Sequence, residues 1–240
     1  MSEIQTNDMI KHGKITHLGL LDLRHLRSVE ELANVTEISH VGTILVSEQL
    51  DGSISNIPMH HVGSIVTIPA EMKVKLLTGD LKLRGEFLEN ANGNPDETLI
   101  VAGGLMITSP FQKVGYKSLI LTGEIFAPKE CEHELTASLS QLYGELFLYT
   151  HEPRMFSGDD LFGREFFAYL KQPVTMFLRG DFVIEADVPL ELLQEKVSEV
   201  YLWGSIQTAN RKQAALLLTL TTLKYGDIRA MQDFEAVSHE

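Results

Sequence analysis

A glycine-centred pattern recurs along this chain at nearly regular intervals, and it constrains the fold more than any other feature. From Gly19 to Gly226 the copies recur about every 21 residues on average. Of the 18 glycines, 14 have an apolar residue two places later, whereas the 44% hydrophobic content predicts about eight. Near Gly79 and Gly85 both glycines fit the pattern, so the register stays open there. The clearest copies centre on Gly19, Gly42, Gly63, Gly85, Gly123, Gly180, Gly204 and Gly226, and looser ones on Gly104, Gly144 and Gly163.

Apolar residues alternate with polar ones around these glycines, as in Val200, Leu202 and Ile206. Such a period of two, rich in β-branched residues, predicts half-buried β-strands. A glycine inside a strand marks a bend or a close approach of another backbone segment. Because the glycine recurs at one phase, we expect the same bend in every copy.

The links between the predicted strands differ along the chain. Helical spacing of apolar residues predicts short helices over 132–142, 190–200 and 211–220. Earlier links are short and carry a proline, as in Ile68-Pro69. We therefore expect β-rich copies over 14–128 and strand–helix copies over 129–231.

A strand and a link of about 20 residues cannot bury an apolar face alone, whereas stacked copies form a continuous core. The pattern therefore predicts a repeat solenoid, either a β-solenoid or a leucine-rich-repeat-like parallel coil, with short helices in its C-terminal half. The similarity to leucine-rich repeats is one of period, because the consensus with its asparagine ladder is absent. We expect one elongated domain over 1–240, with a frayed tail over 232–240. An ordinary α/β or α+β domain is the alternative.

The net charge and the cysteine content indicate which classes of binding partner and which cellular compartment to expect. The formal net charge of −13 disfavours nucleic acids and anionic membranes as partners. The first residues lack the basic and apolar regions of a secretory signal, and no apolar stretch is long enough to span a membrane. The only cysteine, Cys131, excludes an intrachain disulfide and favours a reducing, cytoplasmic location.

His17, His40 and His61 share one phase of the pattern, two places before a glycine. If the copies stack, their imidazoles form a column with about 4.8 Å between neighbours. Such a column is either a metal-binding or proton-responsive site or, as we favour, a structural stack. A stack predicts early loss of the N-terminal copies below about pH 6, because the rings would repel one another once protonated.

Aromatic residues supply the candidate partner-binding surface. Phe162, Phe166 and Tyr169 lie in an irregular copy together with Phe167, where they form a binding surface or, as we favour, fill the core. Alternation predicts that Tyr201 and Trp203 point outward while Leu202 points inward. These two residues are further candidates for a partner surface.

Familiar catalytic motifs are absent from the sequence: it contains no P-loop, no nucleophile elbow and no H-E-x-x-H zinc motif. Acidic residues such as Asp22 and the pair Asp159-Asp160 are more typical of a solvated surface than of acid–base catalysis. We expect a non-catalytic scaffold without a cofactor that binds a protein partner or self-associates. The alternative is a carbohydrate-acting or metal-dependent enzyme on a β-helix scaffold.

Overall fold

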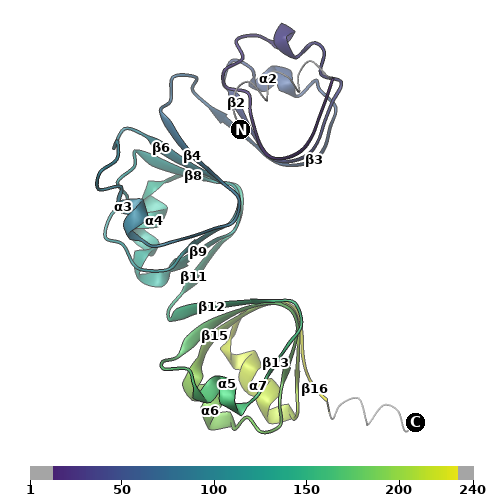
Figure 1. The fold of residues 1–240 in the computed structure, drawn as a ribbon, viewed down its shortest axis with the longest axis vertical. Helices are drawn as coiled ribbons and strands as arrows, with labels where there is room; N and C mark the ends of the chain where they lie inside the picture. Colours follow the sequence, from purple (N-terminus) through teal and green to yellow (C-terminus); the bar gives the residue numbers. More distant parts are fainter. Residues whose placement is uncertain (1–12, 232–240) are drawn as a thin grey trace, which may run out of the picture. The chain divides into compact units, whose positions relative to one another are not determined.

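The computed structural model describes residues 13–231 and divides the chain into two compact units, residues 1–147 and 148–240 (Figure 1). The fold is rich in β-strands, its sheets are parallel, and its helices are short. The expected frayed tail at 232–240 lies outside the described residues. The prediction of one continuous elongated domain stays a prediction.

Unit 1 begins with a three-stranded parallel sheet in the order β1-β2-β3. Its pairing places Val41 beside Leu18 on one side and beside Val62 on the other. The elements of this part are β1 (Lys14–Asp22), η1 (Val29–Leu32), β2 (Glu37–Ser47), α2 (Asp51–Ile54) and β3 (Met59–Ile68). The short helix η1 is a 3₁₀ helix.

Two four-stranded parallel sheets follow in unit 1, in the orders β4-β6-β8-β10 and β5-β7-β9-β11. Leu20, Leu45 and Val66 of the first sheet pack with Ile100 and Ile120 of the second in one buried cluster. The strands are β4 (Val74–Thr78), β5 (Leu81–Leu83), β6 (Thr98–Ala102), β7 (Leu105–Ile107), β8 (Ser118–Leu121), β9 (Ile125–Pro128), β10 (Leu139–Leu142) and β11 (Leu146–Tyr149). The helices are α3 (Glu86–Glu89), η2 (Lys129–Cys131) and α4 (Glu132–Ser138).

Unit 2 contains one parallel sheet in the order β12-β14-β15-β16, with β13 also paired to β14. The helices α5, α6 and α7 connect the strands, and each contacts the next (Figure 1). The elements are β12 (Glu152–Ser157), β13 (Asp160–Phe162), α5 (Arg164–Ala168), β14 (Val174–Ile184), α6 (Leu190–Lys196), β15 (Val197–Thr208), α7 (Arg211–Leu220) and β16 (Thr221–Ala230).

Glycines at matching positions of neighbouring strands lie directly beside one another. A Cβ added to Gly42 would come within 2.6 Å of the carbonyl oxygen of Gly19, so only glycine fits there. Each next glycine in a column has the same relation to the one before it. The three glycine columns are Gly19-Gly42-Gly63, Gly79-Gly103-Gly123-Gly144 and Gly158-Gly180-Gly204-Gly226.

These columns correct the sequence alignment at three places. Gly79 belongs to a column, which settles the ambiguous register against Gly85. Gly103 stands where the alignment has Gly104, and Gly158 where it has Gly163. The reason is backbone geometry. The carbonyl group of the neighbouring strand lies so close that only glycine fits at the stacked position, whereas an apolar residue two places later does not identify that position.

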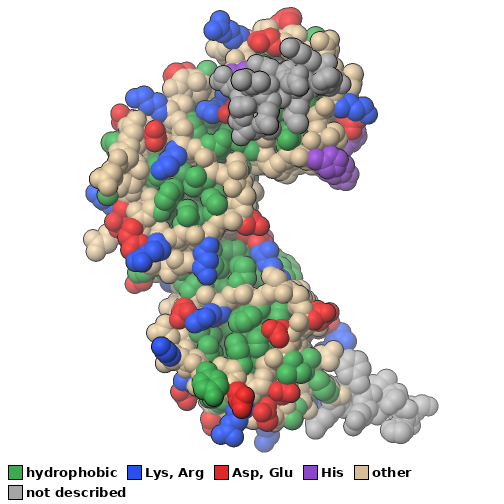
Figure 2. Space-filling view, viewed as in Figure 1, with side chains coloured by type: hydrophobic (Ala, Val, Ile, Leu, Met, Phe, Trp, Pro, Cys, Tyr) green, Lys and Arg blue, Asp and Glu red, His purple; other side chains and the backbone are tan. Residues whose placement is uncertain are grey.

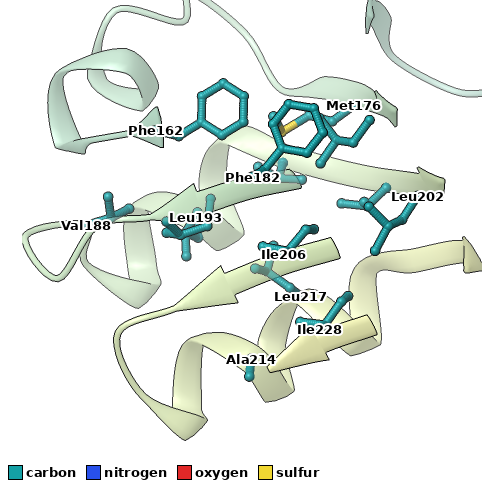
Figure 3. Packing of buried hydrophobic residues seen from close by; sticks show 14 of the residues in the cluster. Phe162, Met176, Phe182, Val188, Leu193, Leu202, Ile206, Ala214, Leu217 and Ile228 are labelled. Carbon is teal, nitrogen blue, oxygen red and sulfur yellow. The ribbon is translucent and has the colours of Figure 1, made fainter. Parts of the chain in front are cut away.

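The core of unit 2 lies between the sheet and its helices. Strand residues such as Leu202 and Ile206 point toward Leu193 of α6 and Leu217 of α7 (Figure 3). All four side chains are at most 2% exposed. The continuous apolar interior follows from the alternation seen in the sequence, because every second strand residue faces the helices.

The predicted helix over 211–220 is confirmed, whereas the other two predictions extend too far. The segment predicted as a helix over 190–200 becomes a strand at Val197, which pairs with Val174. The segment over 132–142 becomes a strand at Leu139, which pairs with Leu119. Hydrogen bonding to a neighbouring strand outweighs local helical spacing in both segments.

Candidate functional site

The residue before each glycine forms a column on the outer side of the unit 2 sheet. Arg179, Trp203 and Tyr225 occupy equivalent positions of β14, β15 and β16. We call these three residues the aromatic strip. The Arg179 guanidinium carbon lies 4.9 Å from the centroid of the Trp203 ring, which is a cation–π contact. The Trp203 and Tyr225 ring centroids are 6.5 Å apart and their planes differ by 37°.

Exposure increases along the aromatic strip toward β16. Arg179 and Trp203 are half-buried, and the Tyr225 side chain is 54% exposed. A parallel sheet holds all three residues on one rigid element, so a partner would meet them in a fixed arrangement. Trp, Tyr and Arg are the residue types that contribute most to binding energy in protein interfaces.

Hydrogen-bonding groups flank the strip on the other side of the glycine column. Asp181, Ser205 and Asp227 share the position after the glycine. The Ser205 hydroxyl donates to Asp181 Oδ1 at 2.6 Å, and Asp227 forms an ion pair with Arg229. The surface therefore combines a central aromatic area with a polar border, the usual composition of an interface.

A second outward column, three places before the glycine, is covered. Phe177 and Tyr201 stack with ring centroids 4.7 Å apart, and Tyr149 meets Phe177 edge-on. The Tyr201 hydroxyl donates to the carbonyl of Leu148 at 2.6 Å. Burial raises the pKa of this hydroxyl, and the nearby Glu199 carboxylate adds to that effect.

The aromatic candidates predicted from the sequence therefore differ in their surroundings. Leu202 points into the core as predicted, and Trp203 lies in the aromatic strip. The expectation that Tyr201 offers an exposed surface is wrong, because the segment around Leu148 covers it and leaves it 4% exposed. Arg179 and Tyr225 were not among the predicted candidates, although each directly precedes the glycine of a predicted copy.

The phenylalanines of the irregular copy belong to the core of unit 2. Phe162 is 1% exposed and Phe167 is fully buried, while half-buried Phe166 packs against both. Phe162 is thus not available as a surface contact, and the alternative that these rings fill the core fits their positions. Tyr169 differs, since its side chain is 82% exposed.

The three histidines form a column on the surface of unit 1, where Figure 2 shows histidine side chains standing out. The ring centroids are 5.0 Å apart between His17 and His40, and 4.8 Å apart between His40 and His61. All three residues have positive φ, at 59°, 54° and 55°. Among residues 13–231, no group of three or more His, Cys, Asp or Glu side chains is arranged to hold a metal ion. The metal role of this column stays a prediction.

The other candidate groups make structural contacts. Asp22 pairs with Arg24 at 2.6 Å, and Asp160 accepts a hydrogen bond from the backbone of Leu161. Cys131 is 1% exposed, its thiol donates to the carbonyl of Phe111, and burial raises its pKa. Such a thiol is a poor nucleophile because little thiolate forms.

Two shallow depressions lie on the surface, one in each unit. The depression in unit 1 has a volume of about 640 Å³ and is lined by Glu89, Pro110, Phe111, Gln112 and Glu130. The depression in unit 2, of about 570 Å³, lies at the start of α7 and includes Asn210 and Arg211. The Asn210 side chain already accepts a hydrogen bond from the backbone of Gln213.

None of the helices over residues 13–231 has the length and hydrophobicity that a membrane span requires. Comparisons with protein-family models, with curated proteins and with solved structures find no match to this chain.

Proposed function

We propose that the chain is a parallel solenoid that acts as a non-catalytic interaction scaffold and binds a protein partner through the aromatic strip of unit 2. The solenoid assignment is supported by the in-register parallel pairing of Gly180, Gly204 and Gly226 and by the other two glycine columns. Stacked copies of this kind present long faces on rigid strands, which suits binding better than chemistry.

The observation that carries the partner-binding role is the Arg179–Trp203–Tyr225 column itself. Exposing a large aromatic side chain to water is unfavourable, and Tyr225 ends the column with more than half of its surface exposed. A partner that covers Trp203 and Tyr225 would remove this apolar area from water. The flanking Asp181 and Ser205 would supply orienting hydrogen bonds. The lone, buried Cys131 supports the expectation of a reducing, cytoplasmic environment.

A site-specific photo-crosslinker tests this proposal. Placed at Tyr225 in the full chain in cells, it should capture one defined protein, and the same group at the exposed Glu191 of α6 should not. The captured protein is then purified and titrated against the unlabelled chain. Because Trp203 is the only tryptophan, its fluorescence reports coverage of the strip directly.

Titration calorimetry measures the Trp203→Ala variant, which lacks the fluorescent ring, and binding should be weaker by about 30-fold or more, as expected for a central aromatic contact. Glu191→Ala, the matched control on α6, should leave it unchanged. Equal capture at both positions, or binding that leaves the Trp203 emission unaltered, would show that the partner does not use this surface.

A further inference from the structure

The last strand of unit 2 has a feature that its neighbours lack. Two places before the glycine, β14 and β15 carry Leu178 and Leu202, which are 1% and 0% exposed in the core. The equivalent residue of β16 is Lys224, and it is exposed. Two places after the glycine, the column Phe182, Ile206 and Ile228 stays apolar to its end. Of these two core-facing columns, only the one that ends at Lys224 changes to a charge in the last strand.

The Lys224 ammonium has a specific partner at the same edge. Its Nζ donates to the carbonyl oxygen of Gly226 at 2.8 Å. In each earlier strand of this column, the glycine carbonyl is approached by the glycine of the next strand, closely enough that a Cβ would collide with it. The hydrogen bond from Lys224 thus engages the carbonyl oxygen that the glycine of a further strand would approach.

β16 is paired only with β15 within residues 13–231, so its other edge presents unpaired backbone groups. An edge of this kind is a template for adding a strand from another molecule, and proteins block such edges with charged side chains, often lysine. The strand that every copy of this chain offers is β16 itself, since a two-fold axis pairs identical edges. A two-fold axis makes this pair antiparallel, and where the pair is centred near Lys224 it would bring two ammonium groups toward each other and partly remove them from water, which is unfavourable.

We propose that Lys224 closes the β16 edge and prevents this strand from pairing with β16 of a second copy. The lysine does so in two ways, by placing a charge in an otherwise apolar column and by holding the Gly226 carbonyl. The inference is independent of the proposed partner surface, because Lys224 is not part of the aromatic strip.

The test replaces Lys224 in the full chain and measures molecular mass by light scattering over a range of protein concentrations. Lys224→Leu restores the apolar column of β14 and β15 and should shift the mass toward twice that of the wild-type species. Lys224→Gln removes the charge but keeps a hydrogen-bond donor, so it should produce a smaller shift. Lys224→Arg should match wild type.

Two controls make the result specific. Lys212→Leu removes another exposed lysine, from α7, and should leave the mass unchanged. Adding Tyr225→Cys provides a crosslinking site on β16, and a short bismaleimide should join two chains there in the Lys224→Leu background only. Cys131 is 1% exposed and reacts much more slowly.

The proposal is overturned if both Lys224→Leu and Lys224→Gln keep the wild-type mass, or if Lys212→Leu associates equally. It is also overturned if chains with wild-type Lys224 already crosslink through position 225. Should Lys224→Leu fail to fold by circular dichroism, Lys224→Gln decides the question in the same assay.

Discussion

The imidazole rings of His17 and His40 lie face to face, with centroids 5.0 Å apart and planes that differ by 2°. Both residues have a left-handed backbone, and the strand pairing continues on either side of them from Thr16 and Ser39 to Leu18 and Val41. Residues other than glycine rarely have a positive φ, and histidine is one of the few that are several-fold enriched among those that do. The column therefore reflects a backbone bend as well as ring contact.

The backbone at His40 leads to a first prediction. His40→Val should lower the free energy of unfolding of unit 1 by about 1–3 kcal/mol, because a β-branched residue is strained at φ 54°. His40→Gly loses the same ring but relieves the backbone, so it should cost clearly less. Urea unfolding followed by circular dichroism, with hydrogen exchange in β2, measures both. If the two variants are equally destabilised, the ring contact and not the bend is responsible.

The first glycine column allows a matched pair of substitutions. Gly42→Ala should destabilise unit 1 by about 1–3 kcal/mol or more, because the new Cβ would lie 2.6 Å from the Gly19 carbonyl oxygen and the strands must move apart. Gly19→Ala should have little effect, since a Cβ there meets no described atom within 4 Å. Thermal unfolding of both variants compares them directly. Similar losses at the two positions would mean that close packing is not the reason for glycine.

Burial of the Tyr201 hydroxyl predicts a pH effect. A raised pKa means that the folded state holds the phenolic proton more tightly than the unfolded state, whose pKa is near 10. This contribution to stability is complete below about pH 10 and decreases as the pH rises through the folded-state pKa. Tyr201→Phe should remove this decrease, and at neutral pH it should cost about 1 kcal/mol through loss of the bond to Leu148.

Alkaline unfolding curves of wild type and Tyr201→Phe measure the difference, and Tyr169→Phe is the control because Tyr169 is 82% exposed. The prediction fails if the three proteins lose stability in parallel above pH 10.

The lowered pKa of Glu86 predicts the opposite dependence of stability on pH, in the acid range. Its hydrogen bond with Arg84 lowers its pKa from 4.5 to about 2, and Ser109 adds a further hydrogen bond. The stabilisation is present above about pH 4.5 and is lost as the pH falls through about 2. Because Glu86 is exposed, we expect a small effect. Titration of its carboxyl signal by NMR measures the pKa, and Arg84→Gln should return it toward 4.5. An unchanged pKa in that variant would rule out Arg84 as the cause.

Sequence reasoning predicted strands around the glycines and a short helix over 211–220, because alternation and helical spacing are local properties. It also placed the three histidines at one phase, and their rings do lie side by side. It failed where two glycines lie close in sequence, as at Gly103 and Gly104, because only a neighbouring backbone distinguishes them.

The partner-binding candidates show the same limit. Alternation correctly predicted that the side chain of Leu202 points inward and that those of its two neighbours point outward. A side chain that points outward from the sheet can still be covered by another part of the chain. Tyr201 is covered by the segment around Leu148, whereas Trp203, two places later, remains half-buried beside Arg179 and Tyr225. Which part of the chain covers an outward residue depends on contacts distant in sequence.

Local sequence patterns were enough to predict the strands and the approximate spacing of the glycines, because alternation of period two and a glycine at a fixed phase are visible within each copy. The parallel arrangement was inferred from the repetition of these copies along the chain, because stacked copies of a strand and a short link run in the same direction. Which glycines stack became clear from the folded chain alone, since each stacked glycine lies against a carbonyl of the neighbouring strand. The tertiary structure also decided that Lys224 ends an apolar column and lies against the Gly226 carbonyl. Lys224 is recognised as an exception only by comparison with Leu178 and Leu202, which the fold places at the equivalent positions of the two preceding strands.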